Sequence, residues 1–284
     1  MMQINSALQS DAQSVAPEPY VPPPSEAPKR DILSLRLSDP FRWLASGLRD
    51  LRAEIGIALF YGVCFWFMAI VLGAVFRNMP EYTMSIASGC LLLGPFLAMG
   101  LYEVSRRREL GRAPELASSL TCWDTHLGSM GMLVLVLIVM ELIWGRASLV
   151  VFAVFFNTGM PSTASVVQAV FDPQNWEFLA VYLAVGGCFA ALVFSSSVVS
   201  LPMILDRDTD AISAVITSIQ VVFSNTMVML LWGFLISSLV LLALLSPWSL
   251  GLLLIGPWLG HASWHAYRGA VRWPVQDGDA AEAV

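Results

Sequence analysis

Six long runs of apolar residues are the feature that most limits what this chain of 284 residues can fold into. A bilayer core about 30 Å thick is crossed by roughly 20 helical residues, because each residue rises about 1.5 Å. The runs are continuously apolar rather than alternating, which indicates helices and not the strands of a barrel. They occupy residues 56–76, 82–102, 127–147, 178–202, 226–246 and 248–267. We therefore predict an all-α, polytopic membrane helix bundle with six transmembrane helices.

Charged residues are too few for a water-soluble protein of this size. They make up 13% of the chain, against 57% hydrophobic residues, whereas soluble domains carry about 25% charged residues. This excludes an ordinary soluble enzyme, and the lack of a basic face in a chain of net charge −6 excludes a nucleic-acid binder. The expected partners are the lipid bilayer and other membrane-protein subunits.

Lys and Arg residues are distributed unevenly among the segments between the runs. Of the 15, 13 precede the first run or follow the second, fourth and sixth, and only Arg77 and Arg146 lie on the other side. Cytoplasmic segments of membrane proteins are enriched in Lys and Arg, so we predict a multi-pass protein with cytoplasmic N- and C-termini. No basic segment followed by an apolar stretch begins the chain, and the first run would itself direct insertion.

The two ends of the chain differ in composition from the rest. Residues 1–33 are rich in proline, and residues 273–284 are acidic. Such segments bury too little apolar surface to offset the entropy lost on ordering. We predict a disordered tail over 1–33, a transmembrane domain over 34–272 and a second disordered tail over 273–284. Residues 157–177 form the one sizeable loop expected on the outer side.

A pattern recurs before the first, third and fifth runs. Apolar residues at spacings of three and four predict an amphipathic helix at the membrane interface, clearly in the first and fifth cases and weakly in the third. We infer a threefold internal repeat of an interfacial helix, an outward span and an inward span, over 34–112, 113–207 and 208–272. Asp39 and Asp210 stand where the first and last interfacial helices begin, and we expect them to be N-caps.

Three prolines, Pro95, Pro202 and Pro257, lie in the runs that lead back to the cytoplasm. Proline removes a backbone hydrogen bond and kinks a helix. Kinks at related positions could open a cavity between the returning helices. Packing alone is the favoured alternative, because Gly and Pro are frequent in membrane helices.

Several short motifs resemble those of a known family. They are Asp39-Pro40 at the start of an amphipathic stretch, Gly94-Pro95-Phe96 before Glu103 and Arg106–Arg108, Leu201-Pro202 before Asp206-Arg207, the Trp-Gly-Arg-Ala segment at 144–147 and the Phe-Phe pair at 155–156. Over about 34–272 the chain resembles a family of predicted bacterial integral membrane proteins of unknown function. Some members are labelled as cytochrome c oxidase of subunit I type. The resemblance implies a bacterial inner-membrane location.

The histidine count tests the oxidase label. A haem–copper centre of that enzyme class needs about six histidines, and this chain has only His126, His261 and His265. An oxidase catalytic subunit is therefore rejected, while a role beside an oxidase is not. His261 and His265 share one helix face and could meet His126 to hold a metal or a haem. Interfacial residues with polar tips are the favoured alternative, so no cofactor is expected.

Glu141 lies inside the third run, and Arg146 follows five residues later. Ionisable residues within a membrane are costly and are candidates for function. Proton or ion relay is one interpretation of Glu141. A buried acid that ties helices together, perhaps through the hydroxyls of Ser195–Ser197, is the favoured one. The apolar residues continue past the run, so this helix is either long or broken at Gly145.

No motif of a hydrolase, a membrane protease or a phosphate-binding loop is present, so an enzyme is not expected. The leading hypothesis is a non-enzymatic structural, accessory or assembly subunit, linked to respiratory complexes by the family label alone. The alternative is a small-solute or ion transporter or channel that uses Glu141 and the kinked returning helices. A haem- or metal-binding membrane protein is a weaker alternative.

Overall fold

The computed structural model describes residues 30–79, 83–156 and 173–273. Within it, Ile32–Arg272 forms one compact unit. The predictions for residues 1–29 and 274–284, and for most of the outer loop, lie outside the described residues.

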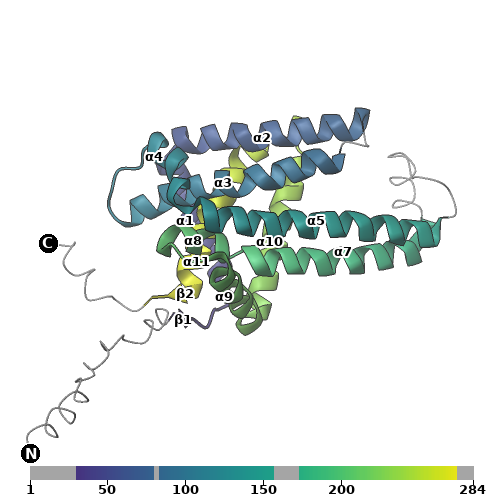
Figure 1. Ribbon diagram of the computed structural model, residues 1–284. Coiled ribbons are helices and arrows are strands. Elements are labelled where there is room, and N and C mark those ends of the chain that lie inside the picture. The colour runs from purple at the N-terminus through teal and green to yellow at the C-terminus, as the bar shows by residue number, and fades with distance from the viewer. Residues whose placement is uncertain (1–29, 80–82, 157–172, 274–284) are drawn as a thin grey trace, which may run out of the picture. The chain divides into compact units, whose positions relative to one another are not determined.

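Each of the six apolar runs carries a long helix. These are α2 (Ile55–Asn78), α3 (Thr83–Glu109), α5 (Leu127–Phe155), α7 (Trp176–Ser197), α10 (Thr226–Leu245) and α11 (Leu252–Ala270). Helices α2, α3, α5 and α7 lie side by side in that order (Figure 1). Helix α5 continues through Gly145 without a break, so the long form of the predicted helix is confirmed.

Shorter elements join these helices. They are β1 (Asp31–Ile32), α1 (Asp39–Ala53), α4 (Leu116–Thr121), α8 (Ser200–Arg207), α9 (Ala211–Ser224) and β2 (Val271–Arg272), with 3-10 turns η2 (Asp124–His126), η3 (Pro173–Asn175) and η4 (Pro247–Ser249). Strands β1 and β2 pair in a two-stranded sheet. The described part of the chain is otherwise helical or irregular, which confirms the all-α prediction.

Four helical segments are long and apolar enough to cross a membrane. They are Ile55–Asn78, Leu116–Phe155, Trp176–Arg207 and Thr226–Leu245. Helices α3 and α11 are not among them. Helix α11 ends in polar and charged residues, such as His265 and Arg268, that lower its hydropathy.

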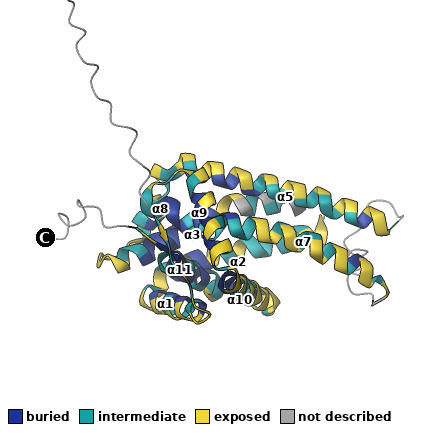
Figure 2. Cartoon of the chain, turned by 90° about the horizontal axis from the view of Figure 1, so that it is seen from below, coloured by how far each residue is buried: buried dark blue, intermediate teal, exposed yellow. Residues whose placement is uncertain are grey.

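The buried side chains gather around α1, α3, α8 and α11, whereas α5 and α7 are largely exposed along their length (Figure 2). Trp264 and Tyr267 of α11 and Met203 of α8 are almost fully buried. By contrast, Leu183 of α7 is 62% exposed and many other large apolar side chains on α5, α7 and α10 are exposed. Contiguous apolar surface on this scale indicates contact with lipid or with another protein.

The predicted amphipathic helices α1 and α9 are present. The buried side of α1, with Trp43, Gly47 and Leu51, packs along α11 and not against lipid. Gly47 permits this, since a Cβ there would lie 2.6 Å from the Ala262 backbone nitrogen. Trp43 packs edge-on against Trp232 of α10 on the same face.

One of the two predicted N-caps is confirmed. The Asp210 side chain accepts a hydrogen bond from the Ser213 N–H at the start of α9. The prediction for Asp39 is wrong, because Asp39 is already helical and accepts from the Arg36 N–H before the helix. The helix begins one residue earlier than predicted, with Ser38 at the N-cap and Pro40 in the first turn, where its missing N–H would have no helical acceptor.

Candidate functional site

A cluster of hydrogen-bonded polar side chains lies where α1, α3 and α11 meet. Helix α1 turns Asp50 inward, because Asp50 follows the buried Trp43 by seven residues, about two helical turns. Asp50 Oδ2 accepts from Ser105 Oγ and from His265 Nε2, each at 2.8 Å. Asp50 Oδ1 accepts from Arg108 Nε at 3.2 Å. One carboxylate thus joins three helices.

The hydrogen bonds of Ser105 fix the tautomer of His261. Ser105 has one hydroxyl proton, which it donates to Asp50, so its oxygen must accept the bond that joins it to His261 Nδ1 at 2.8 Å. The proton of neutral His261 therefore sits on Nδ1. The bare Nε2 is buried and has no hydrogen-bond partner among the described residues. A buried polar atom of this kind costs about 1–3 kcal/mol.

The hydrogen bonds to Asp50 also control its ionisation. Burial raises the pKa of the Asp50 carboxyl, but the hydrogen bonds from His265 and Ser105 and the nearby histidines outweigh burial and hold the pKa below its ordinary value of 3.8. Asp50 is therefore a carboxylate at neutral pH. That charge state is the one that can accept three hydrogen bonds at once.

Ion pairs extend from this cluster to α8. Glu103 accepts from both Arg106 and Arg107, which lie one turn further along α3. Arg106 reaches Asp206 of α8 at 3.6 Å, and Tyr267 of α11 donates to the same carboxylate at 2.7 Å. These partners are half-buried, so their interactions are screened less than those of exposed pairs.

A second link joins the ends of α3 and α11. The Arg268 guanidinium binds the Glu109 carboxylate at 2.8 and 3.0 Å, and Trp264 Nε1 donates to it at 3.0 Å. Arg106 and Arg108 after the second run, and Arg268 after the sixth, therefore contact acids of neighbouring helices. The sequence predicted that these arginines orient the chain in the membrane. It did not predict their ion pairs with acids of other helices.

The three histidines of the predicted metal or haem site have different partners. His261 and His265 join Asp50, whereas His126 donates from Nδ1 to Asp208 at 2.9 Å, at the junction of η2 with the end of α8. Among the described residues, no group of three or more His, Cys, Asp and Glu side chains is arranged to hold a metal ion.

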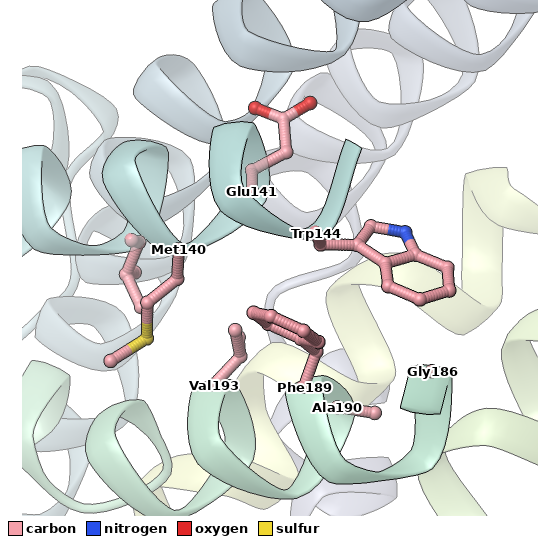
Figure 3. A pocket seen from close by; sticks show the side chains of 8 residues that line it. Met140, Glu141, Trp144, Gly186, Phe189, Ala190 and Val193 are labelled. Carbon is pink, nitrogen blue, oxygen red and sulfur yellow. The ribbon is translucent and has the colours of Figure 1, made fainter. Parts of the chain in front are cut away.

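Glu141 contributes to a cavity of about 310 Å³ between α5 and α7. The rest of its lining is apolar, with Leu137, Met140 and Trp144 from α5 and Gly186, Phe189, Ala190 and Val193 from α7. Figure 3 shows the Glu141 carboxylate pointing away from the α7 residues. Trp144 packs over Gly186, where a Cβ would lie 3.1 Å from the indole ring.

The serine hydroxyls of α7 that were suggested as partners of Glu141 donate to carbonyls of their own helix. Ser195 donates to the Leu192 carbonyl, and Ser196 and Ser197 donate to the Val193 carbonyl. Serine hydroxyls on a helix often bond back to their own backbone in this way. Arg146 lies one turn beyond Glu141 and is exposed.

The three prolines do not occupy equivalent positions. Pro95 lies inside α3 and Pro257 inside α11. Pro202 is the third residue of α8, a separate helix that begins at Ser200 after a break in the chain of helical turns. Trp176–Arg207 is nevertheless one candidate span, and the break lies three to four residues before Pro202, where a proline disturbs the preceding helical turn. A kink at Pro202 therefore stays a prediction.

The exposed apolar helices, four of them able to cross a bilayer, define an α-helical integral membrane protein. Residues 83–206 match the model of a family described as "Predicted integral membrane protein (DUF2189)". This stretch runs from the start of α3 almost to the end of α8, and over it the family resemblance predicted from the sequence is confirmed. No curated protein and no solved structure matches the chain.

Proposed function

We propose that the chain is a non-enzymatic, structural, accessory or assembly subunit of the bacterial inner membrane. The observation that carries this proposal is that acidic side chains link one helix to another. Asp50, Asp206 and Glu109 all bind side chains of neighbouring helices. The cluster thus holds helices together, and the helices present large apolar surfaces outward.

Six spans with both termini in the cytoplasm belong to the same proposal. Helix α3 lies beside α2, and Ser105 near the end of α3 bonds to Asp50, which lies just before α2 begins. If α2 crosses the membrane, α3 therefore returns across it. The same reasoning supports the return of α7, because His126 before α5 bonds to Asp208 after α8.

Site-specific photo-crosslinking tests the subunit hypothesis. A photoreactive residue would replace Leu142 on α5, Leu183 on α7 or Phe234 on α10, each of which is exposed. A subunit should crosslink to one protein partner from one of these helices and not from the others. Lipid adducts alone from all three positions, with no protein co-purifying in mild detergent, would refute the proposal.

Transport is the second candidate, and the position of Glu141 at a cavity in the middle of α5 favours it. Glu141→Gln separates the two functions, with Glu177→Gln at the exposed start of α7 as the matched control. Normal assembly with loss of ion flux into proteoliposomes, in Glu141→Gln alone, would support transport. Loss of assembly would support the helix-tying role. An absorption spectrum of the same preparation tests the haem alternative, which requires a Soret band.

A further inference from the structure

Three exposed arginines form a stripe along α1 on the side opposite its buried face. Arg42, Arg49 and Arg52 recur at spacings of seven and three, which place them along one side of a helix. Trp43, Gly47 and Leu51 of the same helix are buried against the rest of the protein. The buried face anchors α1, and the arginine stripe is left at the surface.

The arginines of this stripe differ from those of α3. Arg106, Arg107 and Arg108 are paired with buried acids. In the stripe, Arg42 is 69% exposed and meets Asp39 at 3.4 Å, and Arg49 donates to the Ser46 hydroxyl. Arg52 has no ion pair among the described residues. The stripe therefore keeps a net positive charge.

The position of the stripe is set by the helix that follows it. A single residue, Glu54, separates α1 from α2, and α2 is one of the segments able to cross a membrane. The last turn of α1 must then lie at the level of the lipid headgroups. Phe41 and Leu37, 55% and 60% exposed, lie near the first arginine. Basic residues beside exposed apolar ones are typical of a helix at an anionic membrane surface.

We propose that Arg42, Arg49 and Arg52 bind the phosphate groups of anionic phospholipids at the membrane surface where α2 begins. Guanidinium groups pair with phosphate through two parallel hydrogen bonds. The exposed apolar side chains favour a lipid surface over an acidic soluble protein. The binding is independent of whether the chain serves as a subunit or as a transporter.

Lipid retention measures this binding directly. The full chain would be reconstituted in phosphatidylcholine with a minority of phosphatidylglycerol, extracted, and examined by native mass spectrometry for retained phosphatidylglycerol. The variant is R42Q/R49Q/R52Q. The matched control, R77Q/R112Q/R146Q, removes three exposed arginines from other parts of the chain. We expect retention to fall by roughly five-fold or more in the stripe variant, because three charges that pair with phosphate are removed, and little in the control.

A third variant, R42K/R49K/R52K, keeps the charge and should retain most of the lipid. Thermal unfolding of all variants should match the native chain, because the stripe makes no buried contact among the described residues. Equal retention in native and stripe variants, or an equal loss in the control, would overturn the proposal. Unchanged lipid together with loss of a bound acidic protein would overturn it too.

Discussion

At the scale of single residues, the Asp50 carboxylate joins three helices. It accepts hydrogen bonds from Ser105, His265 and Arg108, which come from two other helices. Its partners are 55 to 215 residues away along the chain. No local pattern could therefore reveal the cluster. The spacing from Trp43 could have shown that Asp50 faces inward, but not what it meets.

Asp50→Asn should lower the free energy of unfolding by about 1–3 kcal/mol, because it weakens the charge-assisted hydrogen bonds from His265 and Arg108, although Arg108 keeps its second partner, Glu54. Thermal unfolding in detergent would measure this loss. Arg42→Gln is the control, since it breaks only an exposed pair and should change stability by less than about 1 kcal/mol. Equal effects of the two substitutions would contradict the central role of Asp50.

The pKa of Asp50 predicts a dependence of stability on pH. The folded-state pKa lies below 3.8, the ordinary value that the unfolded chain should show. The ionised carboxylate then stabilises the folded state fully above pH 3.8, and this contribution is lost as the pH falls through the folded-state pKa. Unfolding temperatures measured from neutral pH downward should drop more steeply for the native chain than for Asp50→Asn. Parallel curves would show that Asp50 is not responsible.

At the scale of elements, the close contact between α1 and α11 depends on Gly47. A Cβ at this position would meet the Ala262 backbone, which cannot move aside as a flexible side chain would. Gly47→Ala should therefore lower the free energy of unfolding by about 1–3 kcal/mol. Gly131→Ala in α5 is the matched control, because no atom lies within 4 Å of a Cβ there. Alanine is the better helix former, so the control should lose no stability.

The helices could be predicted from the sequence wherever the pattern of apolar residues alone determines the structure. Each long helix was found because a continuous apolar run fits only a helix in a membrane or a buried core. Helices α1 and α9 were found from their periodicity. The packing of α1 on α11 was not, because an apolar stripe fits lipid and protein equally well. The same limit applies to Glu141, whose neighbours on other helices leave no trace in the sequence around it.

At the scale of the whole molecule, the distribution of charge and the contacts between helix ends both support the proposed return of α3 and α7. The contacts of the turn between α10 and α11 do not support a full crossing in the same way. Trp66 Nε1, in the middle of α2, donates to the Trp248 carbonyl at the turn between α10 and α11. The turn thus lies beside the middle of α2. A full crossing by this hairpin would require it to be inclined to α2.

Labelling of single cysteines distinguishes the possible topologies. In a variant with the four native cysteines replaced by serine, one cysteine would be introduced at a time and treated in spheroplasts with a maleimide that cannot cross membranes. The six-span topology predicts external labelling at Asn78, Trp176 and Trp248, and none at Arg112 and Asp208 until the membrane is opened.

A topology with only the four most apolar segments crossing predicts a different pattern. With the N-terminus inside, Arg112 and Asp208 would be labelled from outside, while Trp176 and Trp248 would not, so four positions separate the two topologies. Labelling of Arg112 from outside would overturn the return of α3, and would leave its arginines on the side that the charge distribution disfavours. Trp248 is 81% exposed in the isolated chain. Failure to label it from either side would instead place the α10–α11 turn inside the bilayer, as its bond to the middle of α2 would then require.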